Sequence, residues 1–358
     1  MKKIVLTGGG TAGHVTPNIA LLPALQAAGY EIAYVGSYEG IEKKLIADFN
    51  IPYTGISTGK FRRYLDPKNF SDPFRVMKGF VEARNYLKNY QPDVVFSKGG
   101  FVSVPVVRAA ASLHIPCIIH ESDMTPGLAN KLCIPVAEKV CCNFPETMKN
   151  IPADKAVLTG SPIRAELAEG SKLAGLNMCG FTANKPVIMV IGGSLGAANV
   201  NKAVRDALPK LLEDFQVVHL CGKDKIDNLL LNTPGYKQFE YIKAELKDIF
   251  AMADVVISRA GANAICELLA LKKPNILIPL SAASSRGDQL MNAASFEAQG
   301  YSIVLNEDDI TTNLLVDKVH ELYFNRQNYV DAMSKSHQMD AVKTIMELIN
   351  EAADKKTN

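Results

Sequence analysis

The sequence predicts an α/β protein with two Rossmann-like parallel-sheet domains facing each other across a cleft. Short β-branched runs alternate with helical segments along the chain, and 358 residues suffice for two domains. Two glycine-rich turns, at 8–13 and 192–197, each follow an apolar strand and precede a helix. Backbone N–H groups at such a turn form a typical phosphate site. We therefore expect an enzyme that brings two large substrates together.

The elements follow in order along both halves. Predicted strands lie at 3–7, 31–35, 93–97, 115–119, 139–142, 156–158, 187–191, 216–220, 238–241, 254–257, 275–278 and 302–304. Helices are predicted at 17–28, 102–113, 200–212, 262–271 and 288–299. The stretch 160–185 has little strand signal, which suits an interdomain linker. We place the domains at 1–163 and 164–340, and expect the helix at about 341–355 to pack back onto the first.

Composition narrows the class of protein. The chain is 47% hydrophobic and 21% charged, as in globular domains, and the apolar start ends after three residues, so we expect no secretory signal. Seven cysteines without a C-x-x-C pair predict reduced thiols and no metal site. No run approaches the roughly 18 apolar residues of a membrane span. A nucleic-acid partner is not expected at a net charge of +2.

The first glycine-rich turn matches the dinucleotide fingerprint Gly8-x-Gly10-x-x-Gly13. That fingerprint needs an acidic residue at the end of the second strand, and here Glu39 comes only after it, which disfavours a nicotinamide enzyme. No Gly-Lys-Ser/Thr closes either turn, so a Walker site is excluded. His14 follows the first turn. It could act as a general base, bind a phosphate or only contact the end of the helix.

Further polar residues follow predicted strands of the second half. Ser194 offers either a hydroxyl donor to a leaving group or a helix cap. Glu267 lies on an apolar helix and needs a partner, for which ribose hydroxyls and Arg259 are the two candidates. Gln289 carries an amide suited to sugar hydroxyls.

Three features in the first half point to a second substrate. His120 and Glu121 follow a strand, with Asn130 near in sequence, and form either a general-base site or an internal ion pair. The turn at 98–101 is a third glycine turn on the same rim, placed to face an anionic substrate. Each of these residues follows a parallel strand at its carboxyl end, where α/β sheets bind ligands.

Taken together, these motifs resemble the MurG family over nearly the whole chain. That family transfers N-acetylglucosamine to undecaprenyl-pyrophosphoryl-N-acetylmuramoyl-pentapeptide (lipid I). The matching motifs are the turn at 9–14, Gly99-Gly100-Phe101-Val102-Ser103, His120-Glu121, Gly127-Leu128-Ala129-Asn130, Gly160-Ser161-Pro162-Ile163-Arg164, the turn at 192–196, the stretch 259–267 and Asp288-Gln289.

The resemblance implies a GT-B fold, with a donor site in the C-terminal half and an acceptor site in the N-terminal half, and roles for individual residues. The donor UDP-N-acetylglucosamine would be held by Thr11, Ala12, Gly13, Asp123, Arg164, Ser194, Ile242, Ala262, Asn263, Ala264, Ile265, Cys266, Glu267 and Gln289. The acceptor lipid I would be held by Gly99, Gly100, His120 and Asn130, and the candidate catalytic residues are His14 and Glu121. At position 123 many family members have Asn where this chain has Asp, which weakens the assignment of that position.

The resemblance also implies an inverting transfer in peptidoglycan synthesis, giving lipid II and thus serving cell shape and division. No metal is expected to be required, because helix dipoles, Ser194 and Arg164 can hold the departing UDP. Another nucleotide-sugar enzyme of the GT-B type, with a different acceptor or acting as a 2-epimerase, is the alternative. A sugar-nucleotide sensor would not need His14.

The segment 73–90 predicts a helix with two apolar stripes. One stripe suits the core, and the second consists of Phe74, Met77 and Val81, flanked by Arg75 and Lys78. Either both stripes are buried, or the second contacts an anionic membrane surface. We expect a peripheral enzyme on the cytoplasmic face of the cell membrane, near a lipid-linked acceptor, with other cell-wall synthesis proteins as candidate partners.

Overall fold

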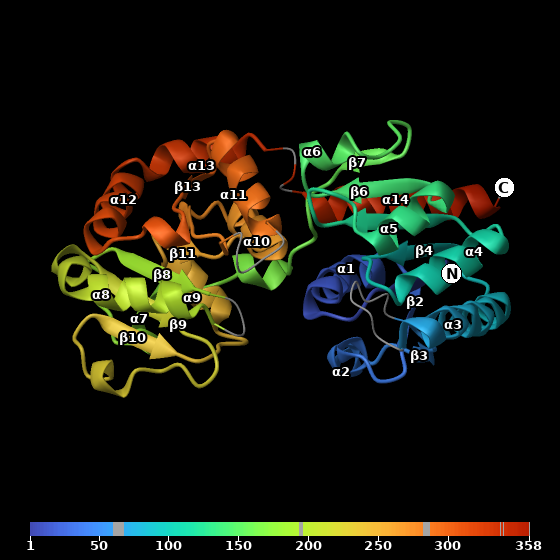
Figure 1. Cartoon of the computed structure of the whole chain (residues 1–358), viewed down its shortest axis with the longest axis horizontal. Coiled ribbons are helices and arrows are strands. Elements are labelled where there is room, and N and C mark those ends of the chain that lie inside the picture. Colours follow the sequence, from blue (N-terminus) through green and yellow to red (C-terminus); the bar gives the residue numbers. More distant parts are fainter. Residues whose placement is uncertain (60–67, 193–195, 282–286, 337, 339, 358) are drawn as a thin grey trace. The chain divides into compact units, whose positions relative to one another are not determined.

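The computed structural model describes residues 1–59, 68–192, 196–281, 287–336, 338 and 340–357. Two compact units are present, one of residues 1–164 with 340–358 and the other of residues 165–339 (Figure 1). In the described part of the chain, no helix is both long and apolar enough to cross a bilayer.

Unit 1 is a parallel sheet with helices on both faces. Its described strands have the order β3-β2-β1-β4-β5-β6-β7. They are β1 (Lys3–Thr7), β2 (Glu31–Ser37), β3 (Tyr53–Ile56), β4 (Val94–Ser97), β5 (Cys117–Glu121), β6 (Lys139–Cys142) and β7 (Ala156–Leu158). The helices are α1 (Thr16–Ala27), α2 (Ile41–Ile46), α3 (Lys68–Tyr90), α4 (Ser103–Ser112), α5 (Leu128–Cys133), α6 (Pro145–Met148) and α14 (Ala341–Thr357).

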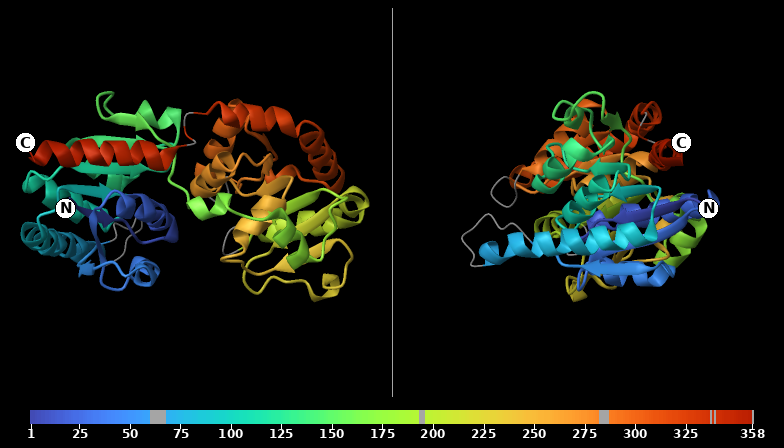
Figure 2. Two further views of the ribbon diagram at one scale, coloured as in Figure 1. Left: turned by 180° about the vertical axis from the view of Figure 1, so that it is seen from behind. Right: turned by 90° about the vertical axis from the view of Figure 1, so that its right-hand side faces the viewer.

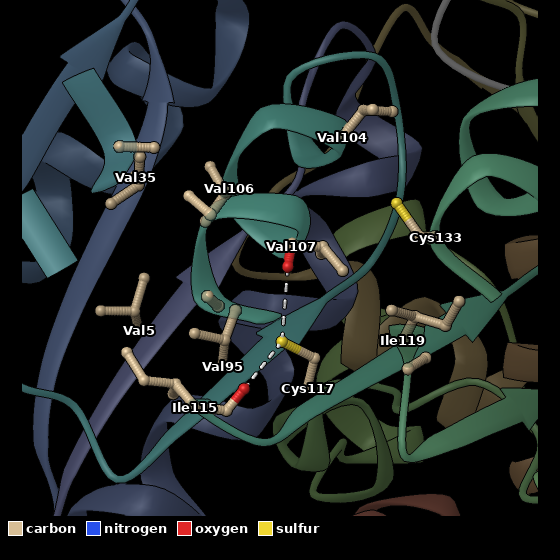
Figure 3. Close-up of a cluster of buried hydrophobic side chains, with 14 of the residues drawn as sticks. Val5, Val35, Val95, Val104, Val106, Val107, Ile115, Cys117, Ile119 and Cys133 are labelled. Atoms are coloured by element: carbon tan, nitrogen blue, oxygen red, sulfur yellow. Dashed lines mark hydrogen bonds between the residues drawn. The ribbon is translucent and has the colours of Figure 1, made fainter. Parts of the chain in front are cut away.

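The sheet of unit 1 is buried on both faces. One face packs on α3, α4 and α5 through Val5, Val95 and Ile119. Figure 3 shows this cluster, in which the Cys117 thiol donates to the carbonyls of Val107 and Ile115. The opposite face packs on α1 and on the C-terminal helix α14. Figure 2 shows α14, in red, running along this sheet. The apolar stripe of α14 therefore packs the C-terminal end of the chain against the sheet of the first unit.

Unit 2 repeats the same architecture. Its described strands have the order β10-β9-β8-β11-β12-β13 and are all parallel. They are β8 (Val187–Ile191), β9 (Gln216–Leu220), β10 (Tyr236–Phe239), β11 (Val255–Ser258), β12 (Asn275–Leu277) and β13 (Ser302–Val304). The helices are α7 (Lys172–Cys179), α8 (Ala198–Asp214), α9 (Leu246–Met252), α10 (Ala262–Ala270), α11 (Asp288–Ala298), α12 (Thr312–Phe324) and α13 (Arg326–Ser334). The predicted fold class, two Rossmann-like parallel-sheet domains, is thus confirmed.

Two expectations about elements were wrong. The stretch expected to be a linker contains α7, which packs on α9 so closely that a Cβ at Gly175 would lie 2.4 Å from the carbonyl oxygen of Asp248. The strand β3 was not predicted. It is four residues long and includes Gly55, whose missing side chain makes room for Tyr38.

In each sheet the strand order reverses beside the first strand of the unit. Connections leave β1 and β4 in opposite directions in unit 1, and β8 and β11 do the same in unit 2. Doubly wound sheets bind ligands at the carboxyl ends of strands at such a switch point. Both predicted glycine-rich turns leave from these positions.

Candidate functional site

The first glycine-rich loop connects β1 to a short 3-10 helix at Ala12–His14 and then to α1. Gly10 has φ 86°, in the left-handed region that favours glycine. A Cβ at Gly9 would lie 2.5 Å from the carboxyl carbon of Glu42. The loop therefore needs glycine both for its backbone shape and for close packing.

Glu42, which sequence reasoning missed, is a buried carboxylate beside this loop. It accepts hydrogen bonds from the backbone N–H of Gly10 at 3.1 Å and of Ser37 at 2.9 Å. A Cβ at Gly36 or Gly40 would also lie within 2.8 Å of its side chain. One of the backbone N–H groups expected to form a phosphate site, that of Gly10, therefore already donates to an internal carboxylate from α2.

His14 lies at the end of the loop as a neutral imidazole. Its Nδ1 is 3.0 Å from the carbonyl oxygen of Gly9 and 3.2 Å from Oγ1 of Thr11. Because a carbonyl only accepts, Nδ1 carries the proton and the ring lone pair is on Nε2. Burial and the nearby Lys98 ammonium lower the pKa of His14 from its ordinary value of 6.5, against smaller opposing effects of Gly9 and Glu42. The ring is thus an available base at neutral pH.

The turn at 98–100 packs directly on the first loop. The N–H of Gly9 donates to the carbonyl of Gly99 at 3.3 Å, and a Cβ at Gly100 would lie 2.3 Å from the Gly9 carbonyl oxygen. The structure thus brings together two glycine turns that lie 90 residues apart. They border a cavity of about 720 Å³ whose lining includes His14, Tyr38, Ser57, Arg75, Lys78 and Phe101.

The predicted acceptor residues His120 and Asn130 and the candidate catalytic residue Glu121 are engaged in internal hydrogen bonds. His120 is fully buried, with Nε2 2.8 Å from the carbonyl oxygen of Gly160. Glu121 accepts from the N–H groups of Asp123 and Gly127 and from Nδ2 of Asn130, at 2.9–3.0 Å. Both carboxylate oxygens of Glu121 therefore stabilise the loop that follows β5 through hydrogen bonds.

One predicted residue near this loop keeps a polar atom that a ligand could use. Within the described residues, Oδ1 of Asn130 is buried without a hydrogen-bond partner, and a Cβ at Gly99 would lie 3.5 Å from it. The backbone carbonyl of Asp123 accepts from Oγ1 of Thr147, and its side chain is partly exposed.

The second glycine-rich loop connects β8 to α8 in unit 2. Gly196 has φ 68°, and a Cβ there would lie 2.0 Å from the carbonyl oxygen of Cys221, so the loop rests on the end of β9. Ser194 lies outside the described residues. The start of α8 at Ala198 places the N-terminus of a 17-residue helix next to the loop.

The stretch predicted to bind the donor nucleotide forms α10. Ile265 and Cys266 are buried, whereas Glu267 and the first turn, Ala262, Asn263 and Ala264, are partly exposed. The carboxylate of Glu267 is on a more accessible face of the same helix.

Arg259 is paired with Glu307 in a buried ion pair, and not with Glu267 as one alternative held. Its Nη1 donates to the carbonyls of Ile278 and Pro279 at 3.0 and 3.2 Å. Burial raises the pKa of Glu307, but hydrogen bonds and the charge of Arg259 outweigh it, so the net shift is downward. These contacts of Arg259 join the segments that follow β11, β12 and β13. Glu307 belongs to no recognisable motif, so sequence reasoning did not identify it.

Three other predicted donor residues are placed as follows. Oε1 of Gln289 accepts from the N–H of Leu280 at 3.1 Å, which leaves its Nε2 as the group suited to donate to a ligand. Ile242 is buried, and Nε of Arg164 is buried without a hydrogen-bond partner among the described residues. An unsatisfied guanidinium N–H is expected where an anion binds.

Two doubly wound units, each with a glycine-rich loop after the first strand of its sheet, define the GT-B class of fold, which the chain shares with a solved MurG structure. The glycosyltransferase family 28 N-terminal domain matches residues 4–142, and the family's C-terminal domain matches residues 187–349. The chain belongs to glycosyltransferase family 28.

Named relatives cover almost the whole chain. One from Lachnospira eligens is 65% identical over 98% of this chain and 99% of its own length. One from Clostridium botulinum is 58% identical over 98% of this chain. Both are named UDP-N-acetylglucosamine–N-acetylmuramyl-(pentapeptide) pyrophosphoryl-undecaprenol N-acetylglucosamine transferase.

Solved structures agree on the fold. Acinetobacter baumannii MurG is 28% identical and has a TM-score of 0.77, covering 98% of this chain and 100% of that one. A UDP-GlcNAc 2-epimerase from Neisseria meningitidis has a TM-score of 0.68, covering 98% of this chain and 100% of that one, but is 15% identical, which is a likeness of fold alone.

Proposed function

We propose that the protein transfers N-acetylglucosamine from UDP-N-acetylglucosamine to the 4-hydroxyl of the N-acetylmuramoyl residue of lipid I, giving lipid II in peptidoglycan synthesis. The observation that carries this proposal is the 58–65% identity, over 98% of the chain, to relatives named for that transfer. The residues at the two switch points supply a base, anion-binding groups and polar groups for a sugar nucleotide, which supports it.

In this proposal most donor-binding residues follow strands of the second sheet, whereas Arg164 is at the end of the first segment of unit 1. Glu267 accepts hydrogen bonds from the ribose hydroxyls, Gln289 donates to the sugar through Nε2, and the backbone of Ile242 contacts the uracil. Arg164 and the N-terminus of α8 stabilise the diphosphate as charge develops on the departing UDP. The unsatisfied Nε of Arg164 supports its part.

The acceptor is held in the cavity of unit 1, where Arg75 and Lys78 supply positive charge for its pyrophosphate. The 4-hydroxyl oxygen attacks the anomeric carbon, the bond from that carbon to the UDP oxygen breaks, and the hydroxyl proton passes to Nε2 of His14. A single displacement inverts the α-linked donor to a β-linked product. We assign the base to His14, because both oxygens of Glu121 already accept hydrogen bonds from its own loop.

An assay with UDP-N-acetylglucosamine and a lipid I analogue tests this proposal. We expect β-1,4 transfer that EDTA leaves unchanged, because the assigned groups stabilise UDP without a metal. UDP-N-acetylglucosamine incubated alone is the control for the alternative 2-epimerase activity. Epimerisation without transfer would contradict the proposal, and a rate abolished by EDTA and restored by Mg²⁺ would contradict its metal independence.

We also infer that α3 docks on an anionic membrane. Ala83 and Leu87 lie in the core, whereas Phe74, Met77 and Val81 are 78%, 63% and 52% exposed. The alternative that both stripes are buried therefore does not hold within unit 1. A Cβ at Gly79 would lie 2.0 Å from the carbonyl oxygen of Ser57, so α3 is held tightly beside the cavity. Its exposed basic residues each add about 1 kcal/mol near an anionic surface.

Changing Phe74 and Met77 together to Ser is expected to weaken sedimentation with anionic vesicles, because it removes the apolar contact. High salt should release the unmodified protein, since the basic residues are screened. Leu229→Ser with Phe324→Ser is the matched control, because those side chains are 93% and 75% exposed in unit 2. Activity on a water-soluble acceptor should survive. If both double variants sediment equally with anionic vesicles, the membrane contact is not made by Phe74 and Met77.

A further inference from the structure

Lys98 is a buried lysine at the carboxyl end of β4. Its exposure is 1%, and its backbone N–H donates to the carbonyl of Thr7 at 2.9 Å, which joins it to the end of β1. A Cβ at Gly8 would lie 3.3 Å from Cβ of Lys98. The side chain therefore starts directly beside the first glycine-rich loop.

The Lys98 ammonium is held by three groups from two segments, the end of β5 and the segment after β7. Nζ lies 2.7 Å from Nδ1 of His120, 2.7 Å from Oγ of Ser122 and 3.2 Å from Oγ of Ser161. His120 accepts as a neutral ring, because its Nε2–H donates to the carbonyl of Gly160. Burial and the Lys98 charge both act to lower the pKa of His120. These partners hold the ammonium by hydrogen bonds.

Two opposite charges therefore flank the loop that ends at His14. Lys98, directly after β4, lies on the Gly8 side, and the carboxylate of Glu42 on α2 accepts from the N–H of Gly10. Arg75 and Lys78 of α3 line the same cavity as His14. After burial, Lys98 is the largest influence that lowers the pKa of His14, and Glu42 acts in the opposite direction.

We propose that Lys98 is a positioning residue for catalysis, which keeps His14 unprotonated while the pyrophosphate of the acceptor is bound. This inference rests on the proposed function. A bound pyrophosphate brings negative charge near His14 and favours its protonated form, in which Nε2 cannot accept a proton. A fixed positive charge beneath the loop offsets that effect. Because the Lys98 side chain is buried and hydrogen-bonded, it cannot reorient to bind the pyrophosphate itself.

The test is an NMR titration of the His14 imidazole in the full chain, with its signal assigned by loss in His14→Gln. In Lys98→Met, which keeps the unbranched stem, we expect the pKa of His14 to rise. In Glu42→Gln we expect it to fall. Ser161→Ala is the matched control, because it removes one hydrogen bond to Lys98 but no charge, and it should leave the pKa unchanged. Opposite shifts would not arise from general loosening of the loop.

The acid limb of the kcat/KM profile should move in the same directions. Equal shifts in Lys98→Met and Ser161→Ala, or none in Lys98→Met, would overturn the proposal. If Lys98→Met does not fold, Lys98→Arg should keep the wild-type pKa, and a lowered pKa in Glu42→Gln is then required. Shifts of the imidazole without a shift of the kinetic limb would overturn both the role of Lys98 in catalysis and His14 as the base, while donor binding would still stand.

Discussion

Replacing His14 with alanine is expected to lower kcat by roughly 10²–10⁴-fold, the effect typical of a lost general base. Nε2 carries the lone pair that would take the proton of the acceptor hydroxyl, since Nδ1 donates to Gly9. Steady-state kinetics with both substrates measures the change, and binding of UDP alone should remain. A kcat within a few-fold of wild type would leave His14 only the role of a helix-end residue.

His114→Asn is the control for this substitution. His114 is exposed and has φ 57°, which asparagine tolerates, so its loss should not affect the rate. The pH dependence gives a second check. Because the pKa of His14 is lowered, the base remains deprotonated as the pH falls to 6.5, and the acid limb of kcat/KM should lie below that value. A limb above pH 6.5 would contradict the assignment.

Glu267→Ala is expected to raise the donor KM by roughly 5- to 150-fold, which corresponds to about 1–3 kcal/mol for unpaired hydroxyls in a buried site. The carboxylate is on the accessible face of α10, and Arg259 is already engaged with Glu307. Kinetics at varied UDP-N-acetylglucosamine measures the effect, and thermal melting checks the fold.

The exposed Glu297 on α11 provides a matched control, because Glu297→Ala removes a carboxylate of unit 2 outside the proposed donor site. Its donor KM should equal that of the wild type. Glu267→Gln keeps one oxygen acceptor and should fall between wild type and Glu267→Ala. A donor KM that is unchanged in Glu267→Ala would remove this residue from the donor site.

Most strands could be predicted, because fully buried parallel strands are continuous apolar runs that sequence pattern detects. The strands β1 and β8 have the expected ends. The strand β3 escaped detection, because its four residues include a glycine and its place at the sheet edge depends on pairing with β2. The helix α7 was read as a linker, because its packing on α9 depends on glycines without an apolar stripe.

The sequence by itself determined the two strand–turn–helix units and the candidate residues that follow them, because glycine turns and apolar runs act over a few neighbouring residues. Only the tertiary structure decided which charges meet there. Glu42 binds Gly10 from 32 residues away, Lys98 binds His120 from 22, and Arg259 binds Glu307 from 48. Such partners meet only after the strands pair and bring distant loops to one edge of the sheet, and burial then makes each charge take a partner.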